Sequence, residues 1–451
     1  MKYLTKIKII SIVLTVCLLI TTISTLTRSG LLYISKDDVD SYNNIVRTID
    51  KDKLNFSVYM GNIVDTYDET ILKNDGIINE NILNYDISYS YLLGNPQFDT
   101  TGILATQFDT LTDCSHSKSN KGIGIKLTID NELQQFAYSL TEGSRKTIVI
   151  MDRFSGKIRA LTSAYHEKFD LSNVTNADLE HYNKSADPIW LPEYLNTYQP
   201  GSVQKIFTAA VAFEEGLDDF FYHDYGYAEF NHKKIYNDYT CYGQLETIRS
   251  AFVNSSNAYF STLGTLIGAK KIKEYSDKFL LNETIETDFG TLRNKTGLKS
   301  TPSDFNIAEY SYGQGESRFS AVSLAMMAQG ATTGTIYQPH IIESTFYYDE
   351  DSENEIMVLD TTQEKVLSDN VVSKNTCDSV LEIMKAAAAS KNLDSSAVGT
   401  KTGTAEISEG NRATIIGVTD NYIIVISEVS DGILYGSSHT NTMSDIVNHL
   451  N

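Results

Sequence analysis

The chain is 451 residues long, and 41% of these residues are hydrophobic. That length is enough for two or three domains, and that composition is typical of a chain that folds around a sizeable core. Acidic residues outnumber basic residues by 58 to 37, which gives a formal net charge of -21 at pH 7. Because nucleic-acid binding depends on a basic surface, this charge excludes nucleic acid as an expected partner. A solubilising surface charge is the simplest explanation of the acidic excess.

The N-terminus contains an apolar segment. Residues 9–26 include no charged residue and no proline. An α-helix of this length is about 27 Å long, which is close to the hydrocarbon thickness of a membrane. Three lysines lie within residues 1–8, which predicts a cytoplasmic tail and an extracytoplasmic main chain. The alternative is a cleaved signal peptide, but no A-x-A-like cleavage site follows, so we expect a single-pass anchor in the cell membrane.

Residues 27–120 differ in composition from the rest of the chain. They are polar, rich in Tyr and Asn, and only weakly periodic, with a turn signal at Asn95-Pro96. This length suits a small extracytoplasmic stalk or dimerisation-like domain and is too short for an independent glycan-polymerising domain. We therefore expect the main domain to cover residues 121–451.

The main domain is expected to alternate between strands and helices. A helix is predicted from Asn131 to near Leu140 and another from about Thr442 to Leu450, and residues 200–400 are predicted to be mostly helical with long loops. Two strands are predicted early and three late: 147–151, 157–162, 400–407, 413–419 and 422–429. Gly156 marks a hairpin turn between the first two. Strands far apart in the chain then share one mainly antiparallel sheet in an α/β domain.

A serine and a lysine lie at the start of a predicted helix that follows Pro200-Gly201. Ser202 falls in the first turn, where free N–H groups and the helix dipole favour a developing anion. Lys205 is three residues further on and therefore on the same side of the helix. Burial in an apolar junction lowers the pKa of a lysine, and a neutral amine takes the proton of a serine hydroxyl. The alternative is that Ser202 caps the helix and Lys205 extends into solvent.

A second motif, Ser255-Ser-Asn257, lies between two helical segments. Ser255 offers a hydroxyl that can shuttle a proton. Asn257 offers a carboxamide that can hold Lys205 and bind a substrate amide. Taken alone, the motif is explained equally well as an ordinary polar loop.

The third motif, Lys401-Thr-Gly-Thr404, begins an extended segment before a predicted strand hairpin. Lys401 supplies positive charge, and Thr402 and Thr404 supply hydroxyls, a combination that suits a carboxylate. Gly403 has no side chain, which allows a substrate to lie close to the strand edge. The backbone N–H groups of Ser202 and Thr404 are predicted to form an oxyanion hole.

Two other glycine-containing segments invite a different interpretation. The triplet Lys295-Thr-Gly297 repeats the start of the third motif, but no strand pattern follows it, and we interpret it as a surface turn. Gly313 and Gly315 precede no strand-to-helix phosphate turn, so we expect no nucleotide cofactor.

The cysteines and histidines indicate no metal site. Cys17 lies in the apolar N-terminal segment, and the spacing of Cys114, Cys241 and Cys377 fits no zinc-binding pattern. The eight histidines are dispersed and form no His-x-x-x-His pair. We expect no cofactor, and the sequence leaves open whether two of the cysteines form a disulfide.

The three motifs, in this order, resemble those of the penicillin-binding proteins and the serine β-lactamases. Residues 198–205, Tyr-Gln-Pro-Gly-Ser-Val-Gln-Lys, resemble the nucleophile segment of the class B penicillin-binding proteins, which are monofunctional transpeptidases with one membrane span. Further segments resemble that family in consistent order: Leu127-Thr-Ile-Asp130, Leu133-Gln134, Gly313-Gln-Gly-Glu316 and Gln338-Pro339. The resemblance covers about residues 121–430.

The resemblance implies a penicillin-recognising fold, with a mainly antiparallel five-stranded sheet flanked by helices. It also implies a penicillin-sensitive peptidoglycan D,D-transpeptidase. In such an enzyme Ser202 attacks the penultimate D-Ala carbonyl of a stem peptide, with Lys205 as base, and D-Ala leaves with a proton supplied through Ser255. An amine of a neighbouring stem peptide then attacks the acyl-enzyme. Thr402 and Thr404 hold the donor carboxylate in the field of Lys401.

The resemblance also implies partners. The expected ligands are stem peptides, lipid II-derived glycan and β-lactams. Because no glycosyltransferase module is recognisable in the sequence, we expect a polytopic membrane glycosyltransferase, contacted through the anchor and stalk, and other wall-synthesis proteins. The stalk departs from the family at residues 60–65, where two arginines that family members often carry are missing.

Three alternatives have different consequences for the same motifs. A β-lactamase needs a deacylating base, and no Glu-x-x-Leu-Asn-like segment lies between Asn257 and Lys401. A D,D-carboxypeptidase uses water in place of the amine, and the sequence does not separate it from a transpeptidase. A non-catalytic β-lactam sensor or scaffold is disfavoured because Ser202 and Lys205 are both retained and only one span is predicted.

Overall fold

The computed structural model describes the greater part of the chain after residue 59: 60–73, 84–95, 102–119, 121–172, 174–185, 188–349, 351, 355–407 and 410–451. These residues all belong to one compact unit, residues 54–451. The predicted tail and anchor, residues 1–26, lie outside the described residues and stay predictions. In the described ranges no helix is both long and apolar enough to cross a membrane.

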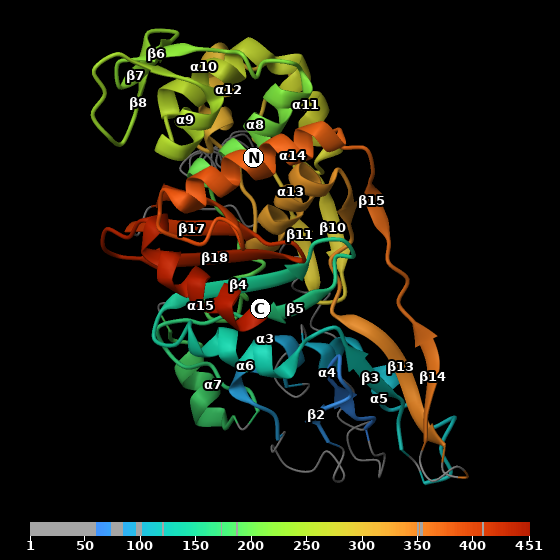
Figure 1. Cartoon of the computed structure of the whole chain (residues 1–451). Coiled ribbons are helices and arrows are strands. Elements are labelled where there is room, and N and C mark those ends of the chain that lie inside the picture. The colour runs from blue at the N-terminus through green and yellow to red at the C-terminus, as the bar shows by residue number, and fades with distance from the viewer. Residues whose placement is uncertain are drawn as a thin grey trace, which may run out of the picture. The chain divides into compact units, whose positions relative to one another are not determined.

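The centre of the fold is a five-stranded antiparallel sheet with the strand order β16-β17-β18-β4-β5 (Figure 1). Its strands are β4 (Arg145–Asp152), β5 (Ile158–Leu161), β16 (Gly399–Ile407), β17 (Gly410–Val418) and β18 (Tyr422–Ser430). All five predicted strands are confirmed. The late strand β18 pairs with the early strand β4, for example Ile424 with Ile150, so the sheet joins the two ends of the main domain.

Helices cover both faces of this sheet, which explains why its strands are apolar on both sides. On β4, Ile148 and Ile150 pack in one cluster with α6 (Asn131–Ser139) and α15 (Thr440–Leu450). Val149 and Met151, which alternate with them, belong to the larger cluster on the other face. That face is covered by α13 (Ala321–Thr333) and α14 (Lys374–Ala389), and α8 (Lys205–Glu214) packs against both of these helices. Figure 1 shows α14 and α15 on opposite sides of the sheet.

The region predicted to be mostly helical contains helices and several strand pairs. Its other helices are α9 (Ile248–Asn254), α10 (Asn257–Ile267), α11 (Ala269–Lys278) and α12 (Asp304–Tyr312). The prediction missed ten short strands: β6 (Tyr222–Asp224), β7 (Tyr227–Phe230), β8 (Lys233–Tyr236), β9 (Gln244–Glu246), β10 (Thr284–Thr287), β11 (Gly290–Arg293), β12 (Ile336–Tyr337), β13 (Ile342–Asp349), β14 (Glu355–Thr361) and β15 (Val366–Ser368). Most of these strands have only two to four residues, too few to show a period of two.

A second sheet lies beside the first, with the order β14-β13-β3-β1-β2. Strands β1 (Ile63–Val64) and β2 (Thr70–Leu72) come from the predicted stalk, and β3 (Gly124–Leu127) and β13 come from the predicted main domain. Short helices complete this part: α3 (Ser90–Leu93), α4 (Ile103–Thr106), α5 (Phe108–Leu111) and, further along the chain, α7 (Asn176–Tyr182). The boundary near residue 120 stays a prediction.

A buried charge cluster ties the central sheet to the segment that precedes Ser202. The Glu193 carboxylate, which is fully buried, lies 2.6 Å from Arg145 Nε on β4 and 2.8 Å from Arg412 Nη2 on β17. Burial alone raises the pKa of the Glu193 carboxyl, but the two guanidinium groups outweigh it, so the pKa lies below its usual value. The Arg412 guanidinium also lies 4.1 Å from the centre of the Tyr198 ring. The carboxylate therefore balances two buried cations.

Glu193→Gln removes that charge while keeping the side-chain shape. Because two buried guanidinium groups lose their counter-ion, we expect a loss of about 3 kcal/mol in the free energy of unfolding, measured by urea denaturation. The control is Glu180→Gln, which breaks an exposed pair with Lys184 at 3.9 Å and should cost about 0.5 kcal/mol or less. Equal losses in the two variants would contradict this account.

Candidate active site

The turn that carries Ser202 is shaped by glycine. Gly201–Gln204 form a 3₁₀ turn, and α8 begins only at Lys205, so the prediction that Ser202 lies in the first α-helical turn is wrong in that detail. Gly201 has a φ of +59°, and a Cβ atom there would lie 2.7 Å from the carbonyl oxygen of Thr404. Only glycine allows β16 to come this close to the turn.

The Lys205 amine is the centre of the site. Its side chain is fully buried, and Nζ lies 2.8 Å from Ser202 Oγ. It also lies 2.7 Å from the Ser255 carbonyl oxygen, 2.7 Å from Asn257 Oδ1 and 3.2 Å from Ser255 Oγ. A neutral amine has two N–H bonds and one lone pair. The two oxygens that only accept can take the N–H bonds, which leaves the lone pair for the Ser202 hydroxyl proton.

Burial makes this neutral form accessible near neutral pH. Loss of hydration lowers the pKa of Lys205 to about 7, and the charge of Asp238 opposes the shift. No carboxylate forms an ion pair with Lys205 among the residues that the structure describes. The amine is therefore able to act as a base toward Ser202.

The second motif connects two helices and points two groups at the amine. Ser255 ends α9 in the left-handed conformation, with φ +61° and ψ +39°, and Ser256 caps α10. Ser255 Oγ lies between the two lysines of the site, 2.9 Å from Lys401 Nζ. Asn257 Nδ2 donates to the Tyr236 carbonyl at 2.9 Å, which directs Oδ1 toward Lys205. The motif links the two lysines through one hydroxyl.

The third motif lies on β16, the edge strand of the central sheet. Thr402 and Thr404 are partly exposed on one face of the strand, and Lys401 is buried on the other. A Cβ atom on Gly403 would lie 3.1 Å from Ser202 N. Burial, and secondarily the charge of Lys205, lower the pKa of Lys401 well below its usual value. The edge of β16 therefore lies directly beside the nucleophile turn, with Lys401 contacting Ser255, and the Thr404 hydroxyl accepts from Gly436 N at 3.3 Å.

Side-chain contacts join five of the predicted site residues, and the other three belong to β16 where it passes the nucleophile turn. The five are Ser202, Lys205, Ser255, Asn257 and Lys401, and the three are Thr402, Gly403 and Thr404. The triplet Lys295-Thr-Gly297 is not among them. Thr296 is buried and lies near Asn282, so the interpretation of this triplet as a surface turn is wrong.

The sequence did not reveal what Gly313 does. Its carbonyl oxygen accepts from Gly201 N at 2.9 Å, and its φ is +96°. A Cβ atom on Gly313 would lie 1.7 Å from the Gly201 carbonyl oxygen. Gly313 therefore supports the nucleophile turn. The one sequence signal for this role was the resemblance of the Gly313-Gln-Gly segment to a segment of the family, which did not say what the glycine does.

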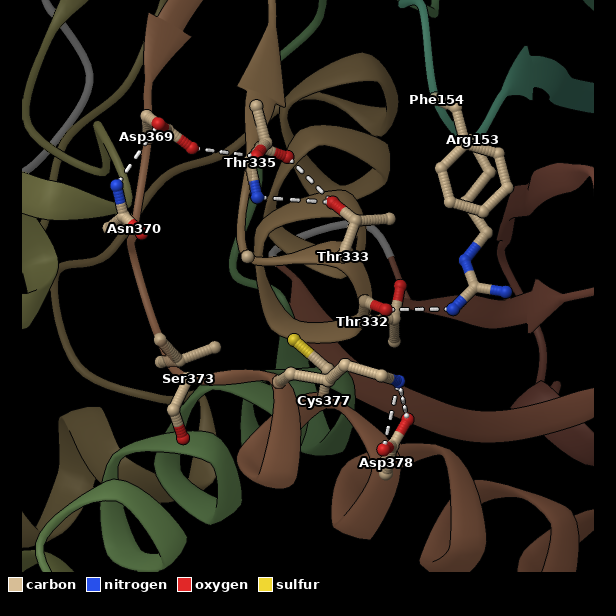
Figure 2. Close-up of a pocket in the computed structure, with 13 residues that line it drawn as sticks. Arg153, Phe154, Thr332, Thr333, Thr335, Asp369, Asn370, Ser373, Cys377 and Asp378 are labelled. Carbon is tan, nitrogen blue, oxygen red and sulfur yellow. Dashed lines mark hydrogen bonds and ion pairs between the residues drawn. The ribbon is translucent and has the colours of Figure 1, made fainter.

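A cavity of about 380 Å³ lies elsewhere, at the N-terminal end of α14 (Figure 2). Arg153 and Cys377 line it, and none of the motif residues does. Burial raises the pKa of the Cys377 thiol to about 11, so it is protonated at neutral pH and a poor nucleophile. Cys114, Cys241 and Cys377 are free thiols. In the described ranges no group of His, Cys, Asp or Glu is placed to hold a metal ion.

Comparison with known proteins identifies the family. The family model of the penicillin-binding protein transpeptidase domain matches residues 146–446, and the chain belongs to this family. Stage V sporulation protein D of Bacillus subtilis is 25% identical over 357 residues, which is 73% of this chain and 52% of that protein. Penicillin-binding protein PbpB of Mycolicibacterium smegmatis is 26% identical over 237 residues, 50% of this chain and 35% of that protein. The chain thus spans about half or less of the length of these relatives.

Solved structures show the same fold. Penicillin-binding protein A of Mycobacterium tuberculosis superposes with a TM-score of 0.77 at 18% identity, over 87% of this chain and 99% of that one. The D,D-transpeptidase domain of a peptidoglycan glycosyltransferase from Eggerthella lenta gives 0.72 at 21% identity, over 88% and 98%. The predicted five-stranded transpeptidase fold is therefore confirmed.

The pH dependence of acylation tests the Lys205 amine as the base. The rate at which fluorescent penicillin acylates the protein should rise with pH and level off above the Lys205 pKa of about 7, because only the neutral amine takes a proton. Asp238→Asn removes a charge that raises this pKa, so the rising limb should move to lower pH. The exposed Asp431→Asn is the control and should leave the limb in place. A rate independent of pH between about 5 and 9 would contradict this assignment.

Gly313→Ala tests the support of the nucleophile turn. The added methyl group overlaps the Gly201 carbonyl and displaces Ser202, so the acylation rate should fall by about 100-fold. Gly143→Ala is the matched control, because Gly143 also has a positive φ of +74° but has no atom within 4 Å of the added Cβ. Equal acylation rates in the two variants would show that Gly313 does not position Ser202.

Proposed function

We propose that the protein is a penicillin-sensitive serine-type D,D-transpeptidase that cross-links peptidoglycan stem peptides through an acyl-Ser202 intermediate. The observation that carries the proposal is the 2.8 Å contact between Lys205 Nζ and Ser202 Oγ, with the amine fully buried. Membership of the family supports the reaction class. The distances between the motif residues support the roles proposed for them.

In the proposed acylation step, the Lys205 amine takes the hydroxyl proton as Ser202 Oγ attacks the penultimate D-Ala carbonyl. The backbone N–H groups of Ser202 and Thr404 stabilise the oxyanion. The departing D-Ala nitrogen then receives a proton through Ser255, whose Oγ lies 3.2 Å from Lys205 Nζ. The C–N bond breaks and an ester to Ser202 remains.

In the proposed second step, an amine of a neighbouring stem peptide attacks this ester. The amine loses a proton to the same lysine and serine groups, and Ser202 Oγ recovers its proton as the ester bond breaks. Thr402 and Thr404 hold the carboxylate of the donor before D-Ala leaves. Lys401 Nζ lies 2.9 Å from Ser255 Oγ, so this lysine contacts the proton route directly.

Two further features belong to this proposal. The chain would be held by a single-pass anchor at residues 9–26, with the catalytic domain outside the cell membrane. A polytopic membrane glycosyltransferase would supply the glycan strands. A D,D-carboxypeptidase or a β-lactamase would form the same adduct and differ in what removes it.

The fate of the adduct tests the proposal. The detergent-solubilised full chain should gain the mass of one fluorescent penicillin and keep it for many minutes, because no dedicated base for water is expected beside the ester. Ser202→Ala should form no adduct, and Ser300→Ala, which removes an exposed serine, should behave as the wild type. An adduct on the Ser202→Ala protein would refute the proposed nucleophile. Rapid release of hydrolysed drug would identify a β-lactamase instead.

A further inference from the structure

Exposed aromatic side chains gather in one small part of the molecule beside the active site. We call residues 221–246 the aromatic lobe; it contains β6, β7, β8 and β9 and projects beyond α9 and α10 (Figure 1). Among the described residues, 17 large hydrophobic side chains are exposed, and six of them belong to this lobe: Phe221, Tyr225, Tyr227, Tyr236, Tyr242 and Leu245. Because large exposed apolar patches mark interaction sites, this local concentration is a candidate binding surface.

Four of the six side chains are tyrosines, and two of these form a pair. Tyr227 and Tyr236 lie opposite each other on β7 and β8, with ring centres 5.9 Å apart. Lys234 Nζ lies 4.0 Å from the centre of the Tyr227 ring. Tyr225 and Tyr242 are 64% and 89% exposed. The lobe therefore offers flat apolar rings with hydroxyl groups at their edges and a cation beside them.

The lobe is attached rigidly to the second motif. Asp224 is fully buried, and its carboxylate accepts from Ser256 Oγ at 2.6 Å and from Asn237 Nδ2 at 2.8 Å. Asn237 Oδ1 accepts from Ala258 N at 2.9 Å. The Tyr236 carbonyl accepts from Asn257 at 2.9 Å. A ligand held by the lobe is therefore placed at a fixed position relative to Ser202 and Lys205.

These properties indicate one kind of occupant. A sugar ring has an apolar C–H face and a polar rim, which matches an exposed tyrosine ring better than it matches aliphatic side chains. In the proposed reaction the stem peptide is attached to a sugar, and five extended residues span at most about 17 Å. The Tyr236 main-chain carbonyl accepts from Asn257 Nδ2 at 2.9 Å, and Asn257 Oδ1 lies 2.7 Å from Lys205 Nζ, so the main chain that carries the paired rings begins within this reach of the nucleophile.

We propose that the exposed tyrosines of the aromatic lobe form a subsite for the glycan strand of peptidoglycan. This inference rests on the proposed function, because it assigns a place to the strand whose stem peptides react at Ser202. The Tyr227–Tyr236 pair binds the saccharide nearest the reacting stem peptide. Tyr225 and Tyr242 extend the subsite along the strand, away from the second motif.

The test measures binding of soluble glycan strands from which the stem peptides have been removed. The double variant Tyr227→Ala/Tyr236→Ala should bind these strands about tenfold more weakly, because two stacking rings are lost. The double variant Tyr225→Ala/Tyr242→Ala, which removes the two most exposed tyrosines of the lobe, should also lose affinity. Tyr67→Ala removes a tyrosine of similar exposure, 70%, in the segment between β1 and β2 and is the control. Unchanged thermal midpoints would show that the variants fold.

Two results would overturn the proposed glycan subsite. Equal binding by the wild type and both lobe variants, or no binding by the wild type, would overturn the subsite. Binding of the lobe to vesicles of anionic phospholipid without binding to glycan would overturn it in favour of a membrane contact. Acylation of the wild type by fluorescent penicillin, measured in parallel, separates the two proposals. A normal adduct with unchanged strand binding refutes only the subsite, and a missing adduct refutes the proposed function.

Discussion

The burial of one lysine amine is the constraint on which the site depends. Lys205 is fully buried, and its nearest polar neighbours are neutral oxygens. An ammonium group is costly there, so the pKa falls to about 7 and the base becomes available near neutral pH. Ser255 at the end of α9 and Asn257 and Phe260 on α10 surround the amine, with the centre of the Phe260 ring 5.8 Å from Nζ. The fold therefore supplies the chemistry as much as the three motifs do.

Close backbone contacts bring the motifs together, and they explain where glycine is required. Three glycines surround the nucleophile turn: Gly201, Gly313 and Gly403. A Cβ atom on any of them would lie about 3 Å or less from backbone of a neighbouring segment, such as Thr404 O for Gly201 and Val203 N for Gly403. Ser255 adopts a left-handed conformation without being glycine, and its carbonyl and hydroxyl both contact Lys205. These contacts with Lys205 offset the energetic cost of the left-handed backbone conformation at Ser255.

The sequence predicts the central sheet from local signals, and it also predicts the three motifs that the structure brings together. Strand β18 and the second half of β17 are rich in apolar β-branched residues, and each motif begins or joins a recognisable element. The sequence does not predict the 3₁₀ turn at Gly201, because the choice between 3₁₀ and α geometry depends on the contact with Gly313. It also hides the Glu193 cluster, since a single glutamate before Tyr194 carries no sign that Arg145 and Arg412 lie beside it. Ion pairs between single residues that are far apart in the chain leave no periodic pattern in the sequence, so they cannot be predicted from it.

Because the two buried lysines lie close together, binding of the donor carboxylate is expected to change their protonation. Lys401 and Lys205 both contact Ser255 Oγ, and the charge of Lys205 contributes, after burial, to the lowered pKa of Lys401. In the proposed reaction, a donor carboxylate bound at β16 would favour the ammonium form of Lys401. Repulsion from that ammonium then lowers the pKa of Lys205 further and increases the neutral fraction of the base. By this argument the donor carboxylate both orients the peptide and activates Ser202, and the apparent pKa of acylation is the quantity that it shifts.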